Sequence, residues 1–477
     1  MRTHHITTSL VTSMLLLAAC NSPVPEPYGP VPTGAQLAWQ RMEINMFCHF
    51  GPNTFTGAEW GSGDEAESLF NPTALDCRQW VDVAEQAGMK GIILTAKHHD
   101  GFCLWPSTYS SHTVTQSPWN EGHGDVLREF TDACRGRVKA GFYLSPWDRH
   151  DSTYGTPQYN DRFVATLKEV LSSYHDIYEQ WFDGANGEGP NGKRQKYDWE
   201  RFNATVARLQ PNALVFSDVG PGCRWVGNEE GKAGETCWST IDVDGCEPGT
   251  GNPSSDLLMH GRQGGKSWIP AEADISIRPG WFWHADEQPK TVDELMEIYY
   301  NSIGRNALLL LNVPPDSRGL IPAEDSAVLV AFRAERDRIF AHDIAQGGVA
   351  HGEHLRGRRY RADNVLDTAY HTYWAAASND ATLTIDLDSV TEFDIIVIQE
   401  YIPLGQRVTM VNLAINEGDG ICLQTSPEHP LCTTVGYKRI IRCDNDKRWR
   451  TDHLELRFNA LAPPIINRIT LYNSKAQ

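Results

Sequence analysis

The sequence predicts an α/β fold class, with a (β/α)8-type, TIM-like barrel followed by a C-terminal β-sandwich. Between residues 36 and 340, short continuous apolar runs alternate with amphipathic stretches, as expected for parallel strands covered by helices on both faces. Over 345–477 the pattern changes. Apolar and polar residues alternate there, for example at 383–387 and 454–458, as in half-buried antiparallel strands. A chain of 477 residues is long enough for two or three domains.

The barrel elements follow from this pattern. The expected strands are a first one ending near 46–51, and then 91–96, 141–144, 178–182, 213–217 and 307–311. The expected helices are 78–87, 125–134, 162–174, 199–209, 292–302 and 323–340. Thr291 with Glu294 three residues later is a capping-box signature for the fifth of these helices. No GxGxxG follows a strand and no GxxxxGK[ST] occurs, so a nucleotide-binding sheet loses its main sequence support.

Residues 1–20 are expected to be a lipoprotein-type signal peptide. Arg2 precedes a short apolar stretch that ends in Leu-Ala-Ala-Cys, which resembles a bacterial lipobox. The resemblance implies lipidation at Cys20, export, and a location at the outer membrane or facing the periplasm. The alternative is a plain signal peptide with an accidental cysteine. Residues 21–35 are Pro-rich and are expected to form an extended linker, and no later apolar run is long enough to span a bilayer.

The amino-acid composition limits which classes of molecule the protein is expected to bind. Lys+Arg total 42 against Asp+Glu 61, a net charge of −19 with no basic block, so nucleic acid is not an expected partner. The 15 Trp, 16 Tyr and 16 Phe suit either sugar-ring stacking or a large core. Among the cysteines, Cys422 and Cys432 are the best local pair in an oxidising compartment, and the absence of CxxC gives no support for a zinc ribbon.

Catalytic side chains of a barrel gather at the C-terminal ends of its strands. The residues that follow the apolar runs include carboxylates, histidines and tryptophans, which together predict a carbohydrate site. Asp183 is the strongest single candidate, because a carboxylate at the end of an apolar strand is costly to bury without hydrogen-bond partners or a catalytic role. The alternative is a purely structural role as the N-cap of a following helix. His98 and His99 point to opposite faces if the strand continues, so hydrogen bonds to sugar hydroxyls are expected there and a metal is not.

Four segments carry a family resemblance: HFGPNTFTGAEWG (49–61), LTAKHHDGFCLWPS (94–107), GFYLSPWDRH (141–150) and WFDG (181–184). Together they resemble the α-L-fucosidases of glycoside hydrolase family 29 over about residues 36–340. The resemblance implies a retaining mechanism without a metal, and Asp183 as nucleophile. It also implies sugar contacts from His49, Glu59, Trp60, His98, His99, Tyr143 and Trp181. Arg224 resembles a family arginine on the leaving-group side, and Trp283 resembles an aromatic wall.

The acid/base is fixed less firmly. Residues 224–235 (RWVGNEEGKAGE) resemble the branch that acts on α-1,3/4-linked fucose, which implies Glu229 as acid/base, with Glu230 and Glu235 as alternatives. The implied partners are fucosylated oligosaccharides or glycoprotein glycans. Two other functions stay open: another retaining exo-glycosidase, such as a galactosidase, or an inactive surface lipoprotein that binds glycans.

Residues 345–477 resemble the discoidin-like (F5/8 type C-like), galactose-binding type of sandwich at 362–376 and 397–408. In relatives of this shape the loop near 363–367 can hold a structural calcium, and the usual acidic spacing is not kept here. The sandwich is expected to buttress the barrel, with independent sugar binding as the alternative.

Overall fold

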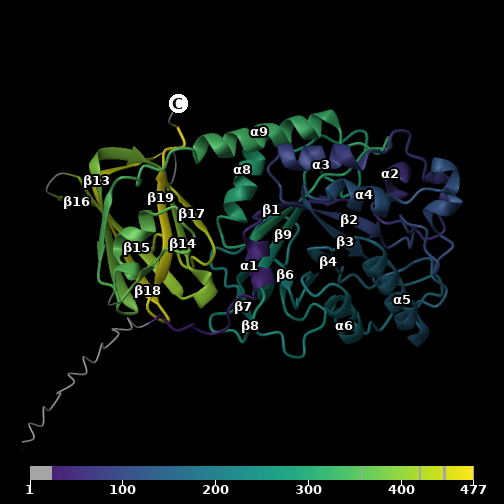
Figure 1. Cartoon of the computed structure of the whole chain (residues 1–477), viewed down its shortest axis with the longest axis horizontal. Helices are drawn as coiled ribbons and strands as arrows, with labels where there is room; N and C mark the ends of the chain where they lie inside the picture. The colour runs from purple at the N-terminus through teal and green to yellow at the C-terminus, as the bar shows by residue number, and fades with distance from the viewer. Residues whose placement is uncertain (1–23, 356, 418–419, 444–446, 476–477) are drawn as a thin grey trace, which may run out of the picture.

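The computed structural model describes residues 24–355, 357–417, 420–443 and 447–475. Eight strands close into a parallel barrel in the order β1-β10-β9-β6-β5-β4-β3-β2, and two antiparallel sheets follow it (Figure 1). The prediction of an α/β barrel followed by a sandwich is therefore confirmed. No helix of the described residues combines the length and the apolar character needed to cross a bilayer.

Six of the eight barrel strands and most of the surrounding helices lie where the apolar runs and amphipathic stretches predict. The strands are β1 (Ile44–Cys48), β2 (Gly91–Lys97), β3 (Lys139–Leu144), β4 (Glu179–Trp181), β5 (Leu214–Ser217), β6 (Cys223–Trp225), β9 (Ala271–Ser276) and β10 (Leu308–Asn312). The helices are α1 (Gly34–Gln40), α2 (Asn53–Thr56), α3 (Cys77–Gln86), α4 (Val126–Cys134), α5 (Pro157–Ser173), α6 (Trp199–Leu209), α7 (Ser255–His260), α8 (Val292–Asn301) and α9 (Ala323–Ile339). A short antiparallel pair, β7 (Thr240–Ile241) and β8 (Ser267–Trp268), lies outside the barrel sheet.

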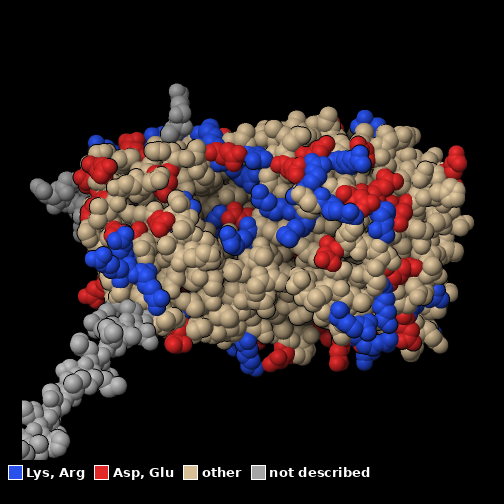
Figure 2. Space-filling view, viewed as in Figure 1, with Lys and Arg blue, Asp and Glu red and all other residues tan. Residues whose placement is uncertain are grey.

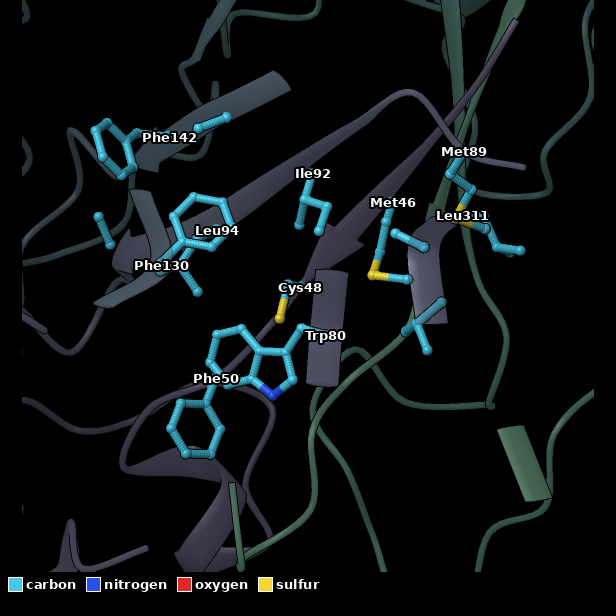
Figure 3. Close-up of a cluster of buried hydrophobic side chains, with 14 of the residues drawn as sticks. Met46, Cys48, Phe50, Trp80, Met89, Ile92, Leu94, Phe130, Phe142 and Leu311 are labelled. Atoms are coloured by element: carbon cyan, nitrogen blue, oxygen red, sulfur yellow. The ribbon is translucent and has the colours of Figure 1, made fainter. Parts of the chain in front are cut away.

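Side-chain alternation divides the barrel core in two. Met46 and Cys48 of β1 and Ile92 of β2 face outward, where they pack with Trp80 of α3 (Figure 3). The residues between them point inward, as Phe47 does, and join the aromatic filling of the barrel. That filling includes Ile93, Tyr143, Trp181, Phe216 and Leu310.

Strands β6 and β9 were not predicted. Their inward-facing side chains are polar or can hydrogen-bond: the Nε1 of Trp225 donates to Asp274 at 2.8 Å, and the Nε1 of Trp181 donates to Glu272 at 2.9 Å. β9 has Glu272 and Asp274 at its inward positions, and β6 is three residues long with Arg224 at its centre, so neither strand forms a continuous apolar run. The pattern that identified the other barrel strands therefore could not find these two.

The sandwich consists of a five-stranded and a four-stranded sheet. The first sheet has the order β11 (Val349–Gly352), β13 (Asp380–Phe393), β18 (Trp449–Ala460), β15 (Val408–Glu417) and β16 (Gly420–Gln424). The second has the order β12 (Trp374–Ala375), β19 (Ile465–Tyr472), β14 (Ile395–Glu400) and β17 (Arg439–Arg442). The alternating apolar residues at 383–387 and 454–458 face one shared core, as their spacing predicts.

The N-terminal segment is held against the sandwich. The backbone N–H of Tyr28 donates to the carbonyl of Leu404 at 3.0 Å, and the buried Arg407 donates to the carbonyl of Glu26. The described part of the expected 21–35 linker is thus docked, and its last two residues begin α1. The expected signal peptide with Cys20 lies outside the described residues, as does the side chain of Cys422, so the pairing with the buried Cys432 stays a prediction.

Two glutamates meet inside the barrel, where both are fully buried. Glu179 of β4 accepts a hydrogen bond from the Nε1 of Trp39 at 2.8 Å and one from the thiol of Cys223 at 3.3 Å. Among the described residues, neither Glu179 nor Glu272 forms an ion pair with Lys or Arg. Burial raises the pKa of Glu179, and burial together with the charge of Glu179 raises the pKa of Glu272 well above its ordinary value. The pair therefore keeps a proton at neutral pH.

Replacing Glu272 with glutamine should reduce the loss of stability at alkaline pH. A carboxyl whose pKa is raised on folding contributes stability that falls as pH rises from the unfolded value, 4.5, through the folded one. The amide keeps an acceptor for Trp181 and cannot ionise. We expect Glu272→Gln to gain about 1–3 kcal/mol over wild type between pH 5 and pH 8. Urea unfolding at both pH values measures it, with the exposed Glu188→Gln as control. An unchanged pH dependence would contradict the shared proton.

Candidate active site

Residues that follow the strand ends converge at the C-terminal mouth of the barrel. His49 follows β1, His98 and His99 follow β2, Tyr143 belongs to β3, and Asp183 lies two residues beyond the end of β4. The ring centroids of His49 and His98 are 5.7 Å apart, and those of His98 and Tyr143 are 5.5 Å apart in a stacked arrangement. The structure thus brings together the residues that the sequence placed at one face.

Asp183 is held by two hydrogen bonds. The hydroxyl of Tyr143 donates to its Oδ2 at 3.0 Å, and the backbone N–H of Ala185 donates to its Oδ1 at 2.7 Å. Its carboxyl is 26% exposed, and no helix begins after it, so the N-cap alternative fails. Burial raises the pKa of Asp183, and the hydrogen bonds from Ala185 and Tyr143 oppose that shift.

The three histidines are neutral. Burial lowers the pKa of His49 and of His99 to about 3, and that of His98 well below its ordinary value. The Nδ1 of His49 lies 2.9 Å from the Oδ1 of Asn312. That oxygen can only accept, so His49 donates through Nδ1 and presents Nε2 as an acceptor. Neutral imidazoles can exchange hydrogen bonds with sugar hydroxyls without adding charge.

A hydrogen bond at Nδ1 also fixes the tautomer of His99. The hydroxyl of Ser145 donates to the carbonyl of Trp147 at 2.8 Å and therefore accepts from the Nδ1 of His99 at 2.7 Å. The Nε2 of His99 then faces the Oδ2 of Asp183, 3.6 Å away. Two acceptors this close to each other form a place for a donating hydroxyl group.

Glu59 and Trp60 form the rim. The Oε2 of Glu59 accepts from the backbone N–H of Trp281 at 2.8 Å, and its Oε1 lies 2.6 Å from the Nε2 of His284. The side chain of Trp60 is 61% exposed, and its ring meets those of His99 and Trp147 edge-on. An exposed tryptophan at a barrel mouth offers a flat apolar face to a sugar ring.

Glu229 borders the mouth beside Trp281. Its Oε2 lies 3.4 Å from the indole nitrogen of Trp281, whose ring is 5.1 Å from that of His49. Partial burial raises the pKa of Glu229, and the charges of Asp183 and Glu59 raise it further. Glu229 and Glu230 are both exposed, and of these two the contact with Trp281 belongs to Glu229; Glu235 lies 3.6 Å from the Nη2 of Arg305. The described contacts therefore favour Glu229 among the three candidates.

The structure places three predicted residues differently from expectation. The aromatic ring beside His49 and Glu229 belongs to Trp281, two residues before Trp283. Trp181 lies deeper, stacked on Phe216 at 4.1 Å and bonded to Glu272, as the floor of the pocket.

Arg224 does not face the pocket. It lies on β6 between the inward-facing Cys223 and Trp225, so it points outward, and it is fully buried. Its guanidinium donates to three backbone carbonyls, those of Leu258, Ile269 and Trp238. We therefore assign Arg224 to bracing the loops outside the barrel, which corrects the expected contact near the leaving group. The apolar-run pattern does not predict β6 as a strand, so the direction of this side chain could not be predicted.

Two further carboxylates, to which the sequence analysis assigns no role, lie beside the pocket. Asp218 follows β5, and its Oδ2 accepts from the backbone N–H of Gly249 at 2.7 Å. Asp274 of β9 is buried, and burial together with the charge of Glu229 raises its pKa well above the ordinary value. Asp218 has the same sequence signal as Asp183, an aspartate after an apolar strand. Asp274 has none, because it lies within an unpredicted strand.

Among the described residues, one group of acidic, cysteine or histidine side chains is close enough to hold a metal: Glu179, Cys223 and Glu272. This group lies beneath Trp181 and is explained by the shared proton. In the loop expected to hold calcium, Asp363 accepts from the backbone N–H of Ala350 and Asp367 from that of Ala369. These separate contacts do not gather a ligand set, and the calcium stays a prediction.

The arrangement suits acid–base chemistry at a sugar. Asp183 is held in place by directed donors, and the pKa of Glu229, which lies beside Trp281, is raised above its ordinary value. Neutral histidines and Tyr143 lie between them. Two carboxyl groups at one barrel mouth, one of them fixed by hydrogen-bond donors, are what glycoside hydrolysis needs.

Comparisons with known proteins agree with this chemistry. A family model described as alpha-L-fucosidase matches residues 31–333. Alpha-L-fucosidase 1 of Arabidopsis thaliana is 42% identical over 461 residues, which cover 95% of this chain and 89% of the plant protein. The crystal structure of SpGH29 superposes with a TM-score of 0.88 at 36% identity, covering 94% of this chain and 99% of that one. A family 29 fucosidase of Ruminococcus gnavus in complex with fucose has a TM-score of 0.86 at 31% identity, covering 95% and 97%.

Proposed function

Because this chain belongs to the alpha-L-fucosidase family, we propose that it is a retaining exo-α-L-fucosidase that releases terminal α-1,3- or α-1,4-linked L-fucose from glycans or glycoconjugates. The observation that carries the proposal is the carboxylate of Asp183, fixed by Tyr143 and Ala185 at the floor of a mouth where Glu229 lies against Trp281. The family is one of glycoside hydrolases.

In the first step, a carboxylate oxygen of Asp183 attacks the anomeric carbon while the bond to the leaving oxygen breaks. Glu229 transfers its proton to that oxygen, and a covalent fucosyl ester forms. In the second step, Glu229 takes a proton from water, the water oxygen attacks the anomeric carbon, and Asp183 leaves as a carboxylate. The configuration is inverted twice and thus retained.

The two environments support these roles. The donors around Asp183 stabilise its ionised form, as a nucleophile requires. The raised pKa of Glu229 lets it hold a proton closer to neutral pH than an ordinary glutamate does. As the ester forms, the charge of Asp183 disappears, which lowers the pKa of Glu229 and prepares it to act as a base in the second step.

The pocket also suits a 6-deoxy sugar. The buried ring of Phe282 lies 5.1 Å from that of His98, and Trp281 borders His49. These apolar surfaces would receive the methyl group of fucose, while the neutral histidines and Tyr143 would bond its hydroxyls. Galactose carries a hydroxyl at that carbon, and burying it without a partner would cost binding energy. A panel of nitrophenyl glycosides separates fucosidase from galactosidase activity, and no turnover of any would favour an inactive glycan binder.

Other parts of the proposal concern location and the second domain. We propose that the chain is exported as a lipoprotein anchored through Cys20, and that 345–477 form a galactose-binding-like domain. Thr434 accepts from the backbone N–H of Cys237, and Gln406 from that of Ser239, both at 2.8 Å. These contacts brace the segment that follows Glu229, in support of a buttressing role.

Azide should separate the two carboxyl roles. With azide present, Asp183→Gly should yield β-fucosyl azide, because azide replaces the missing nucleophile. Glu229→Ala should yield the α product through the covalent ester. Without azide, Glu229→Ala should lose about 10²–10⁴-fold in kcat on poor leaving groups. Product NMR and kinetics measure both effects, with Glu230→Ala as the matched control. Near wild-type turnover by Glu229→Ala would move the acid/base role to Glu230.

Linkage preference should follow the loop at 242–252. Gly249 of that loop bonds to Asp218 and packs against Gly184, beside the nucleophile, so the loop borders the leaving-group side. Binding energy from a branched leaving group can be used in the transition state. We expect higher kcat/KM for Lewis-type trisaccharides than for nitrophenyl fucoside, and poor cleavage of α-1,2-linked fucosyl-lactose. The reverse order, measured by chromatography of the products, would indicate broad specificity.

A further inference from the structure

A groove of about 1090 Å³ lies between α8 of the barrel and β17 of the sandwich. Figure 2 shows basic and acidic side chains together in this central hollow. Three arginines line it: Arg305 after α8, and Arg439 and Arg442 at the two ends of β17. Arg305 and Arg439 are also joined by a backbone bridge. The proposed reaction does not use this groove.

The most buried of these arginines lacks a counterion. Arg439 is 9% exposed; one of its Nη atoms donates to the backbone carbonyl of Glu235, and its Nε has no hydrogen-bond partner. Among the described residues it forms no ion pair. A buried guanidinium without a carboxylate is costly, and such charges are normally paired.

Arg305 is also incompletely neutralised. One Nη donates to the carbonyl of Ala233 at 3.1 Å, and the other lies 3.6 Å from a carboxylate oxygen of Glu235, a side chain that is 78% exposed. Burial and the nearby charge of Arg439 lower the pKa of Arg305. Arg442 differs, because both of its Nη atoms bond to the carboxylate of Glu297.

The other acidic residues of the groove are exposed or engaged. Asp394 accepts from the backbone N–H of Ser474, Glu294 caps α8 at Thr291, and Glu335 pairs with Arg338. Asp293 is exposed on α8. The buried end of the groove is therefore positive, although the chain as a whole carries −19. Local charge, not net charge, would attract an anion here.

We propose that Arg305 and Arg439 form a second binding site, for the sulfate or carboxylate group of an acidic saccharide. A guanidinium presents paired N–H donors that match two oxygens of either group. A groove of about 1090 Å³ has room for sugar rings beyond the charged group. Tyr300, whose ring lies 4.1 Å from the guanidinium carbon of Arg442, adds an aromatic wall.

Thermal unfolding tests the anion site with the full chain. Sodium sulfate should raise the Tm by several degrees more than sodium chloride at equal ionic strength, because a ligand that binds only the folded state stabilises it. Arg439→Met should lose most of that increment and be no less stable than wild type in sulfate-free buffer. Arg305→Gln, which loses the contacts with the Ala233 carbonyl and the Glu235 carboxylate, gives the same readout if Arg439→Met does not fold. The exposed Arg457→Gln is the control.

The proposed anion site would be contradicted if sulfate and chloride raised the Tm equally. It would also be contradicted if both variants kept the additional increase in Tm that sulfate gives. Calorimetry with lactose 3′-sulfate, lactose and inorganic sulfate then distinguishes the source of the anion. We expect the wild-type protein to bind the sulfated sugar at least tenfold more tightly than inorganic sulfate. The Arg305→Gln variant should lose this affinity for the sulfated sugar. Lactose should bind to neither protein. Equal affinity for the sulfated sugar and the free ion would contradict the proposal that the ligand is a saccharide. The readout is binding, so it is independent of whether fucosides are cleaved.

Discussion

Closure of the barrel through the pairing of β1 with β10 is the constraint on which the site depends. This contact joins segments more than 260 residues apart: Ile44 lies opposite Leu309, and at the C-terminal end the ring of His49 bonds to Asn312. Asn312 in turn donates to Ser276 and to the carbonyl of Trp281. One amide therefore fixes the tautomer of His49 and the position of the aromatic wall, so the first and last barrel strands set the pocket together.

Buried charged groups recur through the molecule and are stabilised in different ways. Lys97 and Asp148 neutralise each other behind the histidines, with 2.7 Å between their charged atoms. Glu179 and Glu272 instead keep a proton beneath Trp181. Asp183 and Glu229 lie nearer to solvent. In the proposed reaction Asp183 attacks the sugar and Glu229 transfers the proton. The sandwich contributes by bonding to Cys237 and Ser239, downstream of Glu229, so the segment that follows Glu229 is anchored on both the barrel and the sandwich.

The sequence predicts the barrel and most of the site because the apolar strands are easy to recognise and their C-terminal ends must converge. His98, His99 and Asp183 could be placed from that rule alone. It fails for β9, whose inward-facing residues include Glu272 and Asp274, and for β6, which is three residues long and has Arg224 at its centre. The direction of the Arg224 side chain was therefore predicted wrongly. Trp281 and Trp283 could not be told apart, since no periodicity fixes which ring of an irregular loop faces the pocket.

Trapping the covalent intermediate tests the central claim, that Asp183 is the nucleophile. A 2-deoxy-2-fluoro-L-fucosyl fluoride slows both steps through its fluorine but keeps a good leaving group, so the ester should accumulate. We predict a mass increase of one fluorofucosyl unit per chain, located on the peptide that contains Asp183, and none in Asp183→Gly. A label on another residue, or turnover of ordinary fucosides with no trapped species and inversion of configuration, would contradict the account.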